Sequence, residues 1–258
     1  MRRSERGFSV CLRSVILYRL KLSKRNMDRK KTIFLLILLI WSFIEYGPAL
    51  GLESTPRSPG ADSPSPNRID ESLLVAFGDS LTAGLGVSAT EAYPAVLERK
   101  IKAAGYRYRV INAGVSGETT AGGLQRVNWI LKSRPDIVIL ELGANDGLRG
   151  LDVKQTEKNL SMIIEQLQSK DVRVVLAGMK LPPNYGETYT AAFEKIYPTL
   201  AGRYHLTLIP FFLEGVAAQS ALNQADGIHP TREGYQIIVD KLWPFVEPLF
   251  KLSRLQER

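Results

Sequence analysis

Short apolar runs alternate with longer amphipathic segments along residues 70–258. Five runs of three to six residues, several of them rich in Val and Ile, occupy positions 73–77, 109–112, 137–142, 173–177 and 207–209. Because their apolar residues follow one another without polar alternation, we expect strands that are buried on both faces, as in a parallel sheet covered by helices.

The segments between these runs have the spacing of amphipathic helices. Apolar residues recur at i, i+3, i+4 and i+7 within 160–167 and again within 235–242, ahead of Pro244. Asp152 and Gln155 form the sequence pattern of a capping box before the first of these helices. Strands that alternate with helices predict an α/β protein, here a flavodoxin-like three-layer α/β/α sandwich with a five-stranded parallel sheet. In such sheets ligands bind beyond the carboxyl ends of the strands, so chemistry is expected in the loops that follow strands.

The N-terminal part of the chain has a different pattern. Residues 32–44 form an uncharged run of thirteen residues that directly follows a basic stretch. This length suits the apolar region of a signal peptide better than a full membrane span. We therefore expect residues 1–52 to be a basic leader. It is either a signal peptide cleaved after Gly51 or a signal anchor that keeps residues 32–52 in the inner membrane.

A linker separates this leader from the folded part. Residues 53–69 are rich in Pro and Ser and contain almost no apolar side chains, a composition that cannot form a core. The folded domain is therefore expected at 70–258. Met27 opens a compact basic segment (MDRKK), so the chain starts either at Met1 or at Met27. A leader of this kind predicts an exported protein, periplasmic or secreted.

Charge and residue counts narrow the functional classes. The net charge is +8, but residues 1–31 alone carry +9 and the remaining 227 residues carry −1. A nucleic-acid-binding surface needs an excess of basic residues on the folded domain, and none is present. Cys11 lies in the leader, and His205 and His229 are the two histidines of the chain. We therefore expect neither disulfides nor a Cys- or His-rich metal centre in the domain.

Ser80 directly follows the first predicted strand, in the segment GDSLT at 78–82. A serine at the junction of a strand and a helix exposes its hydroxyl, while backbone N–H groups at the helix start point toward any anion formed there. This placement suits the nucleophile of an acyl transfer. From this segment alone, a helix cap without further role is an equal alternative.

A nucleophilic serine needs a base, and the base needs an orienting group. His229 follows the last predicted strand and has Asp226 three positions before it, in DGIHP at 226–230. Asp226 can therefore hold one ring nitrogen of His229 while the other faces Ser80. His205 precedes a strand, at the opposite end of the sheet, and we expect a surface or packing role for it.

Two further loops after strands offer donors for a developing oxyanion. The loop after the second strand contains Gly114, whose backbone N–H can approach a ligand closely because no side chain intervenes. The loop after the third strand contains Asn145, whose neutral amide can donate a hydrogen bond. Gly and Asn are also ordinary turn residues, so neither assigns a function by itself.

Together these segments resemble the four sequence blocks of the SGNH (GDSL) hydrolase family. The blocks are GDSL at 78–81, Gly114, GAND at 143–146 and DGIHP at 226–230, in the family's order. The segments NAGVSGETTAGGLQR, LELGANDGLRG and PPNYGETY further resemble its bacterial branch of acyl-CoA thioesterases, lysophospholipases and arylesterases. The resemblance covers about residues 72–250.

The resemblance implies a site and a reaction. Ser80 is expected as the nucleophile, with Asp226 and His229 completing a triad. The backbone N–H of Ser80, Gly114 and Asn145 are expected as oxyanion donors. The family needs no cofactor or metal, and the implied partner is a small-molecule acyl ester or thioester.

The expected substrate contacts lie in two apolar loop segments. The resemblance implies that residues 146–151 are a mobile loop that shapes acyl-chain binding. We expect Leu148, Leu151, Pro183 and Tyr185 to contact an acyl chain or aromatic ester. A carbohydrate O-deacetylase on the same site is the alternative among enzymes. A catalytically silent, membrane-tethered binding module is the alternative outside them, although such a module would be expected to lack a triad member.

Overall fold

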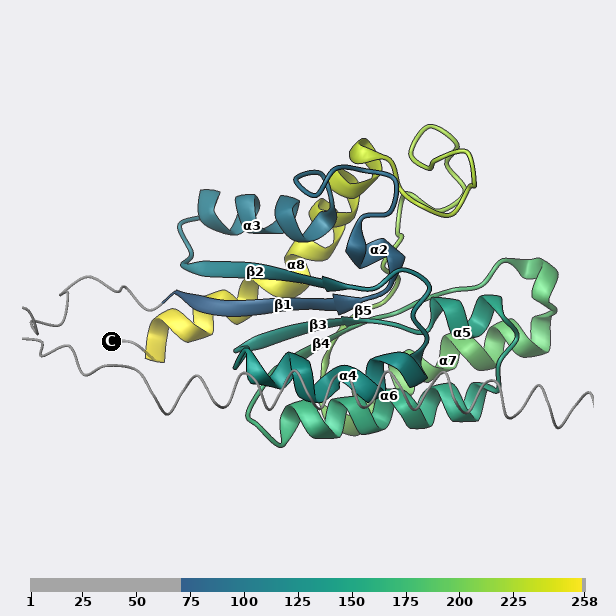
Figure 1. Ribbon diagram of the computed structural model, residues 1–258, viewed down its shortest axis with the longest axis horizontal. Coiled ribbons are helices and arrows are strands. Elements are labelled where there is room, and N and C mark those ends of the chain that lie inside the picture. The colour runs from purple at the N-terminus through teal and green to yellow at the C-terminus, as the bar shows by residue number, and fades with distance from the viewer. Residues whose placement is uncertain (1–70, 257–258) are drawn as a thin grey trace, which may run out of the picture. The chain divides into compact units, whose positions relative to one another are not determined.

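The structure is a computed structural model that describes residues 71–256 (Figure 1). At its centre is a five-stranded sheet in the order β2-β1-β3-β4-β5, in which every neighbouring pair is parallel. The strands are β1 (Ser72–Gly78), β2 (Tyr108–Gly114), β3 (Ile137–Glu141), β4 (Arg173–Ala177) and β5 (Thr207–Ile209). All five predicted strands are confirmed, with boundaries that differ by one or two residues at most.

Helices cover both faces of the sheet, as the alternating pattern predicts. The helices α3 and α8 pack against each other on one face, and α4, α6 and α7 lie on the other (Figure 1). The short helices α2 and α5 lie at the carboxyl end of the strands. The bounds are α2 (Ser80–Ala83), α3 (Tyr93–Ala103), α4 (Thr120–Lys132), α5 (Ala144–Leu148), α6 (Val153–Gln168), the 3-10 turn η1 (Pro183–Tyr185), α7 (Glu187–Tyr204) and α8 (Arg232–Gln256).

Burial along the strands follows their place in the sheet. Every residue of β3, the central strand, is buried, and so is every residue of β1 after Ser72. By contrast, β2 lies at the edge and has exposed positions, among them Arg109. The continuous apolar runs therefore mark the strands that lie between two helical layers.

Helix α6 begins as predicted, with one difference. Asp152 is its N-cap, and Oδ1 accepts hydrogen bonds from the backbone N–H groups of Lys154 (2.7 Å) and Gln155 (3.2 Å). The Gln155 side chain donates to Asn159 Oδ1 (2.8 Å) instead of returning to the N-cap, so the capping box is only half formed. The apolar stripe at 160–167 is buried, as its spacing predicts.

Helix α8 extends well beyond the segment whose spacing predicts it. It continues through Pro244 and Pro248, each of which lacks the N–H that a helix interior normally uses. Its buried face continues past both prolines to Phe250, whose ring centroid lies 4.9 Å from that of Tyr108. Packing of this apolar face against the sheet stabilises the helix in spite of the prolines.

Several expectations fall on the N-terminal part of the chain. The leader at 1–52, its cleavage or retention, and the linker at 53–69 lie outside the described residues. Within residues 71–256, no helix combines the length and the apolar character that a membrane span requires. The same residues include no group of three or more His, Cys, Asp or Glu side chains placed to hold a metal ion.

Candidate active site

Ser80 lies at the carboxyl end of β1, where the chain turns into α2 (Figure 1). We call residues 79–82 the nucleophile turn. Asp79 is the N-cap of the helix, and its Oδ1 accepts the backbone N–H of Leu81 at 3.0 Å. Ser80 is the first helical residue, and its own N–H has no acceptor among residues 71–256. The turn therefore presents a hydroxyl and an unengaged N–H group together at the carboxyl end of β1.

The side chain of Ser80 is hydrogen-bonded to the predicted base. Its Oγ lies 2.9 Å from Nε2 of His229, and Nδ1 of His229 lies 2.6 Å from Oδ2 of Asp226. The other oxygen of Asp226 accepts the backbone N–H groups of His229 (3.0 Å) and Ile228 (2.9 Å). The hydrogen bonds from His229 and Ile228 lower the pKa of Asp226 to about 2, the largest contribution being that of the His229 N–H.

These contacts also determine which nitrogen of neutral His229 carries the proton. An ionised carboxylate can only accept hydrogen bonds, so Nδ1 donates to Asp226. Nε2 then keeps its lone pair and accepts the hydroxyl hydrogen of Ser80. This is the arrangement that a general base requires. His205 is exposed at the end of α7, just before β5 and thus at the opposite end of the sheet.

Asn145 is the second residue of α5, and its side chain reaches back to the nucleophile turn. Nδ2 donates to Oδ2 of Asp79 at 2.9 Å. An amide nitrogen carries two hydrogens, and Nδ2 has no second acceptor among the described residues. Helix α5 starts after Gly143, whose φ of 116° is strained for any residue with a side chain. The contact with Asp79 therefore fixes the amide next to the nucleophile turn and leaves one N–H unengaged.

Gly114 does not lie in the loop where it was expected. It is the last residue of β2, paired in register with Gly78, and not part of the loop after the strand. Its N–H donates to Asn112 Oδ1 at 2.9 Å. A Cβ at this position would lie 2.1 Å from the backbone nitrogen of Ala83. The glycine therefore allows β2 to pack closely against α2, and its N–H is already engaged, which argues against the oxyanion role expected for it.

Gly117, three residues further along, has the properties expected of Gly114. Its φ is 77°, and its N–H has no acceptor among residues 71–256. Its carbonyl accepts a hydrogen bond from the Arg149 guanidinium at 2.8 Å, and Arg149 is the C-cap of α5. The loop is thereby tied to the helix that carries Asn145. Sequence spacing alone does not distinguish two glycines so close together.

Two buried acids lie beneath the site, Asp79 within the GDSL block and Glu141 outside the sequence blocks. Burial raises the pKa of Asp79 to about 6, although hydrogen bonds from Leu81 and Asn145 oppose the rise. Glu141, the last residue of β3, is fully buried, and burial raises its pKa well above the ordinary value. A charged residue at the end of an apolar strand is the sequence signal that points to Glu141.

The predicted substrate residues lie in α5, just after it, and in the 3-10 turn η1. Tyr185 Oη donates to the Leu148 carbonyl at 2.9 Å, and Tyr189 Oη donates to the Leu151 carbonyl at 2.8 Å. Leu148 and Tyr185 are half-buried, whereas Leu151 and Pro183 are exposed. The structure therefore brings Leu148 and Tyr185 together, and two tyrosine hydroxyls hold the loop that the family resemblance marks as mobile.

Three more apolar side chains are exposed on loops that carry site residues. Leu85 follows α2, Val115 follows β2, and Ile228 directly precedes His229. Each is more than two fifths exposed (46%, 46% and 44%). Exposed apolar side chains on segments next to site residues are compatible with a substrate that has an apolar group.

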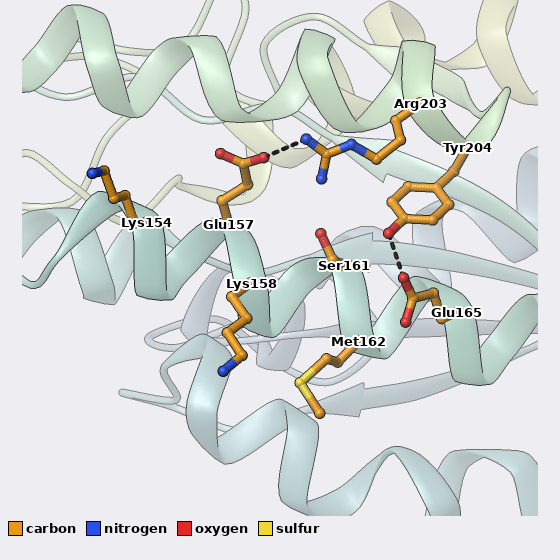
Figure 2. A pocket seen from close by; sticks show the side chains of 8 residues that line it. All are labelled: Lys154, Glu157, Lys158, Ser161, Met162, Glu165, Arg203 and Tyr204. Carbon is orange, nitrogen blue, oxygen red and sulfur yellow. Dashed lines mark hydrogen bonds and ion pairs between the residues drawn. The ribbon is translucent and has the colours of Figure 1, made fainter.

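The pocket in Figure 2 lies away from these residues, between α6 and α7. Two hydrogen bonds join its walls, Arg203 to Glu157 at 2.9 Å and Tyr204 Oη to Glu165 at 2.6 Å (Figure 2). None of the predicted site residues lines it, and its polar side chains hold the two helices together. The remaining lining residues are Lys154, Lys158, Ser161 and Met162.

Comparison with known proteins places the chain in a family. The sequence pattern of the GDSL-like Lipase/Acylhydrolase family matches residues 76–237. The chain is 41% identical over 177 residues to Esterase TesA of Pseudomonas aeruginosa, across 68% of this chain and 88% of that protein. It is also 41% identical over 177 residues to Thioesterase 1/protease 1/lysophospholipase L1 of Escherichia coli (strain K12), across 68% and 84%. The crystal structure of TesA matches with a TM-score of 0.67 at 40% identity, over 69% of this chain and 99% of that one. These matches confirm the resemblance of the sequence blocks, and the chain belongs to the GDSL-like lipase/acylhydrolase family.

Proposed function

We propose that this protein is a serine esterase and thioesterase, which hydrolyses acyl esters or thioesters through an acyl-enzyme on Ser80. The observation that carries the proposal is the continuous series of hydrogen bonds from Ser80 Oγ through His229 to Asp226. The names of two relatives, an esterase and a thioesterase and lysophospholipase, support the same class of substrate.

The reaction proceeds in two halves. Ser80 Oγ attacks the carbonyl carbon, and Nε2 of His229 takes the hydroxyl proton while Asp226 stabilises the imidazolium. As the tetrahedral intermediate collapses, the C–O or C–S bond breaks and the leaving alcohol or thiol receives the proton from His229. Water then attacks the acyl group on Ser80, again with His229 as base. The bond between Ser80 Oγ and the acyl carbon breaks, His229 returns the proton to Oγ, and the carboxylic acid leaves.

Three donors suit the oxyanion of the tetrahedral intermediate. They are the backbone N–H of Ser80, Nδ2 of Asn145 and the backbone N–H of Gly117. Each offers an N–H that no acceptor among residues 71–256 engages. Gly117 replaces Gly114 in this role because the N–H of Gly114 already donates to Asn112. Neutral donors stabilise a developing negative charge without supplying a competing proton.

We propose Leu148, Leu151, Pro183 and Tyr185 as the residues that contact the acyl group of the substrate. The apolar character of the four residues and the exposure of Leu151 and Pro183 support this role, as does the contact of Tyr185 with the Leu148 carbonyl. We further infer that the protein acts after export, in the periplasm or outside the cell, because of its predicted leader. Retention of that leader would tether the enzyme to the inner membrane.

A substrate series tests the proposal. We expect the protein to hydrolyse p-nitrophenyl esters and acyl-CoA thioesters of increasing chain length faster than an acetylated sugar. Ser80→Ala should abolish hydrolysis while circular dichroism shows an unchanged fold. Activity confined to the acetylated sugar would identify a carbohydrate O-deacetylase instead. Full activity of the Ser80→Ala variant would exclude the serine mechanism.

A further inference from the structure

Glu141 is a carboxyl group inside the hydrophobic core. It is the last residue of β3, its exposed fraction is 0%, and its register partner on β1 is Gly78. Burial raises its pKa well above the ordinary value, and the charge of nearby Asp79 acts in the same direction. A carboxyl group in this place costs free energy unless hydrogen bonds compensate. The hydrogen bonds of Glu141 therefore indicate what it does.

Glu141 makes these hydrogen bonds to the nucleophile turn. Its Oε2 accepts a hydrogen bond from the Thr82 hydroxyl, whose Oγ1 lies at 2.7 Å. The backbone nitrogen of Asp79 lies 3.4 Å from the same oxygen. Asp79 and Thr82 lie on either side of Ser80 in the chain, and both are buried. One carboxylate oxygen thus holds the turn before and after the nucleophile.

Gly78 provides the space for this contact. A Cβ at this position would lie 2.4 Å from Oε2 of Glu141 and 2.1 Å from Oγ1 of Thr82. Atoms without a bond between them do not approach so closely, so a larger residue would push the two side chains apart. Gly78, the glycine of the GDSL block, is therefore required by the Glu141–Thr82 hydrogen bond.

The other groups around Glu141 do not share its hydrogen bonds. The hydroxyl of Tyr235 and Oε1 of Glu141 are both buried, and neither has a partner among residues 71–256. Burial raises the pKa of Tyr235, and the charge of Glu141 acts in the same direction. Within the described part of the chain, the side-chain hydrogen bonds of Glu141 run only toward the nucleophile turn.

We propose that Glu141 is a positioning residue, which holds the nucleophile turn so that Ser80 Oγ stays in contact with Nε2 of His229. Through Asp79, the same contact steadies the amide of Asn145. Glu141 touches neither the substrate nor the reacting atoms, so its effect passes through the turn. The inference rests on the proposed function, because it concerns the rate at which Ser80 is acylated.

Glu141→Leu tests the proposal, because it removes the acceptor and keeps a side chain of similar size. We expect kcat on p-nitrophenyl butyrate to fall about 10- to 100-fold, with KM changed by less than about threefold, since a displaced nucleophile slows attack but not binding. Labelling of Ser80 by an alkyl p-nitrophenyl phosphonate should slow by the same factor. The Tm should be recorded beside kcat, because the variant removes a buried carboxyl group but also leaves the buried Thr82 hydroxyl without its acceptor.

Thr82→Val tests the same hydrogen bond from its other end with little change of shape. It should reproduce the fall in kcat, whereas Thr82→Ser, which keeps the hydroxyl, should retain most of the activity. Glu141→Gln also keeps an acceptor and should stay close to wild type. Tyr235→Phe is the matched control, because it removes a buried hydroxyl that has no hydrogen-bond partner among residues 71–256 and leaves the contact between Glu141 and Thr82 in place. It should keep the wild-type kcat and KM.

Two results overturn the positioning role while leaving the proposed function intact. One is wild-type kcat and wild-type labelling in Thr82→Val, which decides the question even where Glu141→Leu does not fold. The other is an equal loss of kcat in Tyr235→Phe, which would report general damage to the core. If the phosphonate does not label Ser80 in the wild-type protein, the proposed function fails and the role of Glu141 fails with it.

Discussion

Asn145 donates a hydrogen bond from Nδ2 to Oδ2 of Asp79, at 2.9 Å and across 66 positions of the chain. Asp79 is at the same time the N-cap of the helix that begins at Ser80. One carboxylate therefore sets the position of both the nucleophile and the amide that is proposed to stabilise the oxyanion. The reaction geometry depends on this link between the loops after β1 and β3.

Asp226→Asn should lower kcat by about 10⁴-fold, because an amide no longer fixes the proton on Nδ1 of His229. The check is kcat on a p-nitrophenyl ester near neutral pH. His205→Ala is the control and should keep full turnover. A loss in His205→Ala comparable to that in Asp226→Asn would contradict the assignment of the base.

Asn145→Ala should lower kcat by about 10²- to 10³-fold with little change in KM, because it removes one proposed oxyanion donor. Steady-state kinetics on short-chain esters measures both constants. The same variant leaves Oδ2 of Asp79 without its donor, so its pH profile should be recorded as well. A change confined to KM would make Asn145 a substrate-binding residue.

Asn112→Ala distinguishes the role of Gly114, at the end of β2, from that of Gly117, in the loop that follows. It removes the acceptor of the Gly114 N–H, so we expect a loss of stability of about 0.5–1.5 kcal/mol with nearly unchanged kcat. Thermal unfolding and ester hydrolysis measure the two effects. A tenfold change in kcat without loss of stability would restore Gly114 as an oxyanion donor in place of Gly117.

Asp79→Asn should stabilise the protein above neutral pH and lower kcat. The pKa of Asp79 in the folded protein, about 6, is above the ordinary value of 3.8. Between about pH 4 and 6 the folded protein therefore binds more protons than the unfolded one, so the contribution of Asp79 to stability falls as the pH rises. Asn still caps a helix and does not ionise.

Thermal unfolding at two pH values checks this expectation. Asp79→Asn should have a Tm roughly 3–6 °C above that of the wild type at pH 8 and nearly the same Tm at pH 4. Its kcat should fall because Asn145 loses a charged acceptor. Equal Tm values of Asp79→Asn and the wild type at pH 8 would mean that burial of the ionised Asp79 carboxylate does not lower the stability of the protein.

Tyr185→Phe should loosen the loop proposed to bind the acyl chain. The hydroxyl donates to the Leu148 carbonyl. Loss of one such hydrogen bond should shift the equilibrium between the ordered and the loosened loop by about 3- to 10-fold. We expect KM for long-chain esters to change by that factor, with acetate esters unaffected. Equal effects on acetate and long-chain esters would place Tyr185 outside acyl-chain binding.

The sequence by itself determined the parallel sheet and the end of the sheet, at the carboxyl ends of the strands, where the site lies. Uninterrupted apolar runs can be buried only between two helical layers, and the alternation with amphipathic segments makes the strands parallel. Ser80 and His229 follow from this pattern, because each comes after a strand and the chain offers only one other histidine. Asp226 follows from its position three residues before His229.

Only the tertiary structure decided which groups are free to act and what supports them. The register of β1 with β2 and β3 places Gly114 on one side of Gly78 and Glu141 on the other. This pairing brings Glu141 beneath the nucleophile turn, whereas the side chain of Asn112 engages the N–H of Gly114. The continuation of α8 through Pro244 likewise depends on packing against distant residues. Hydrogen bonds and packing between residues far apart in the chain depend on register and loop geometry, which local periodicity does not encode.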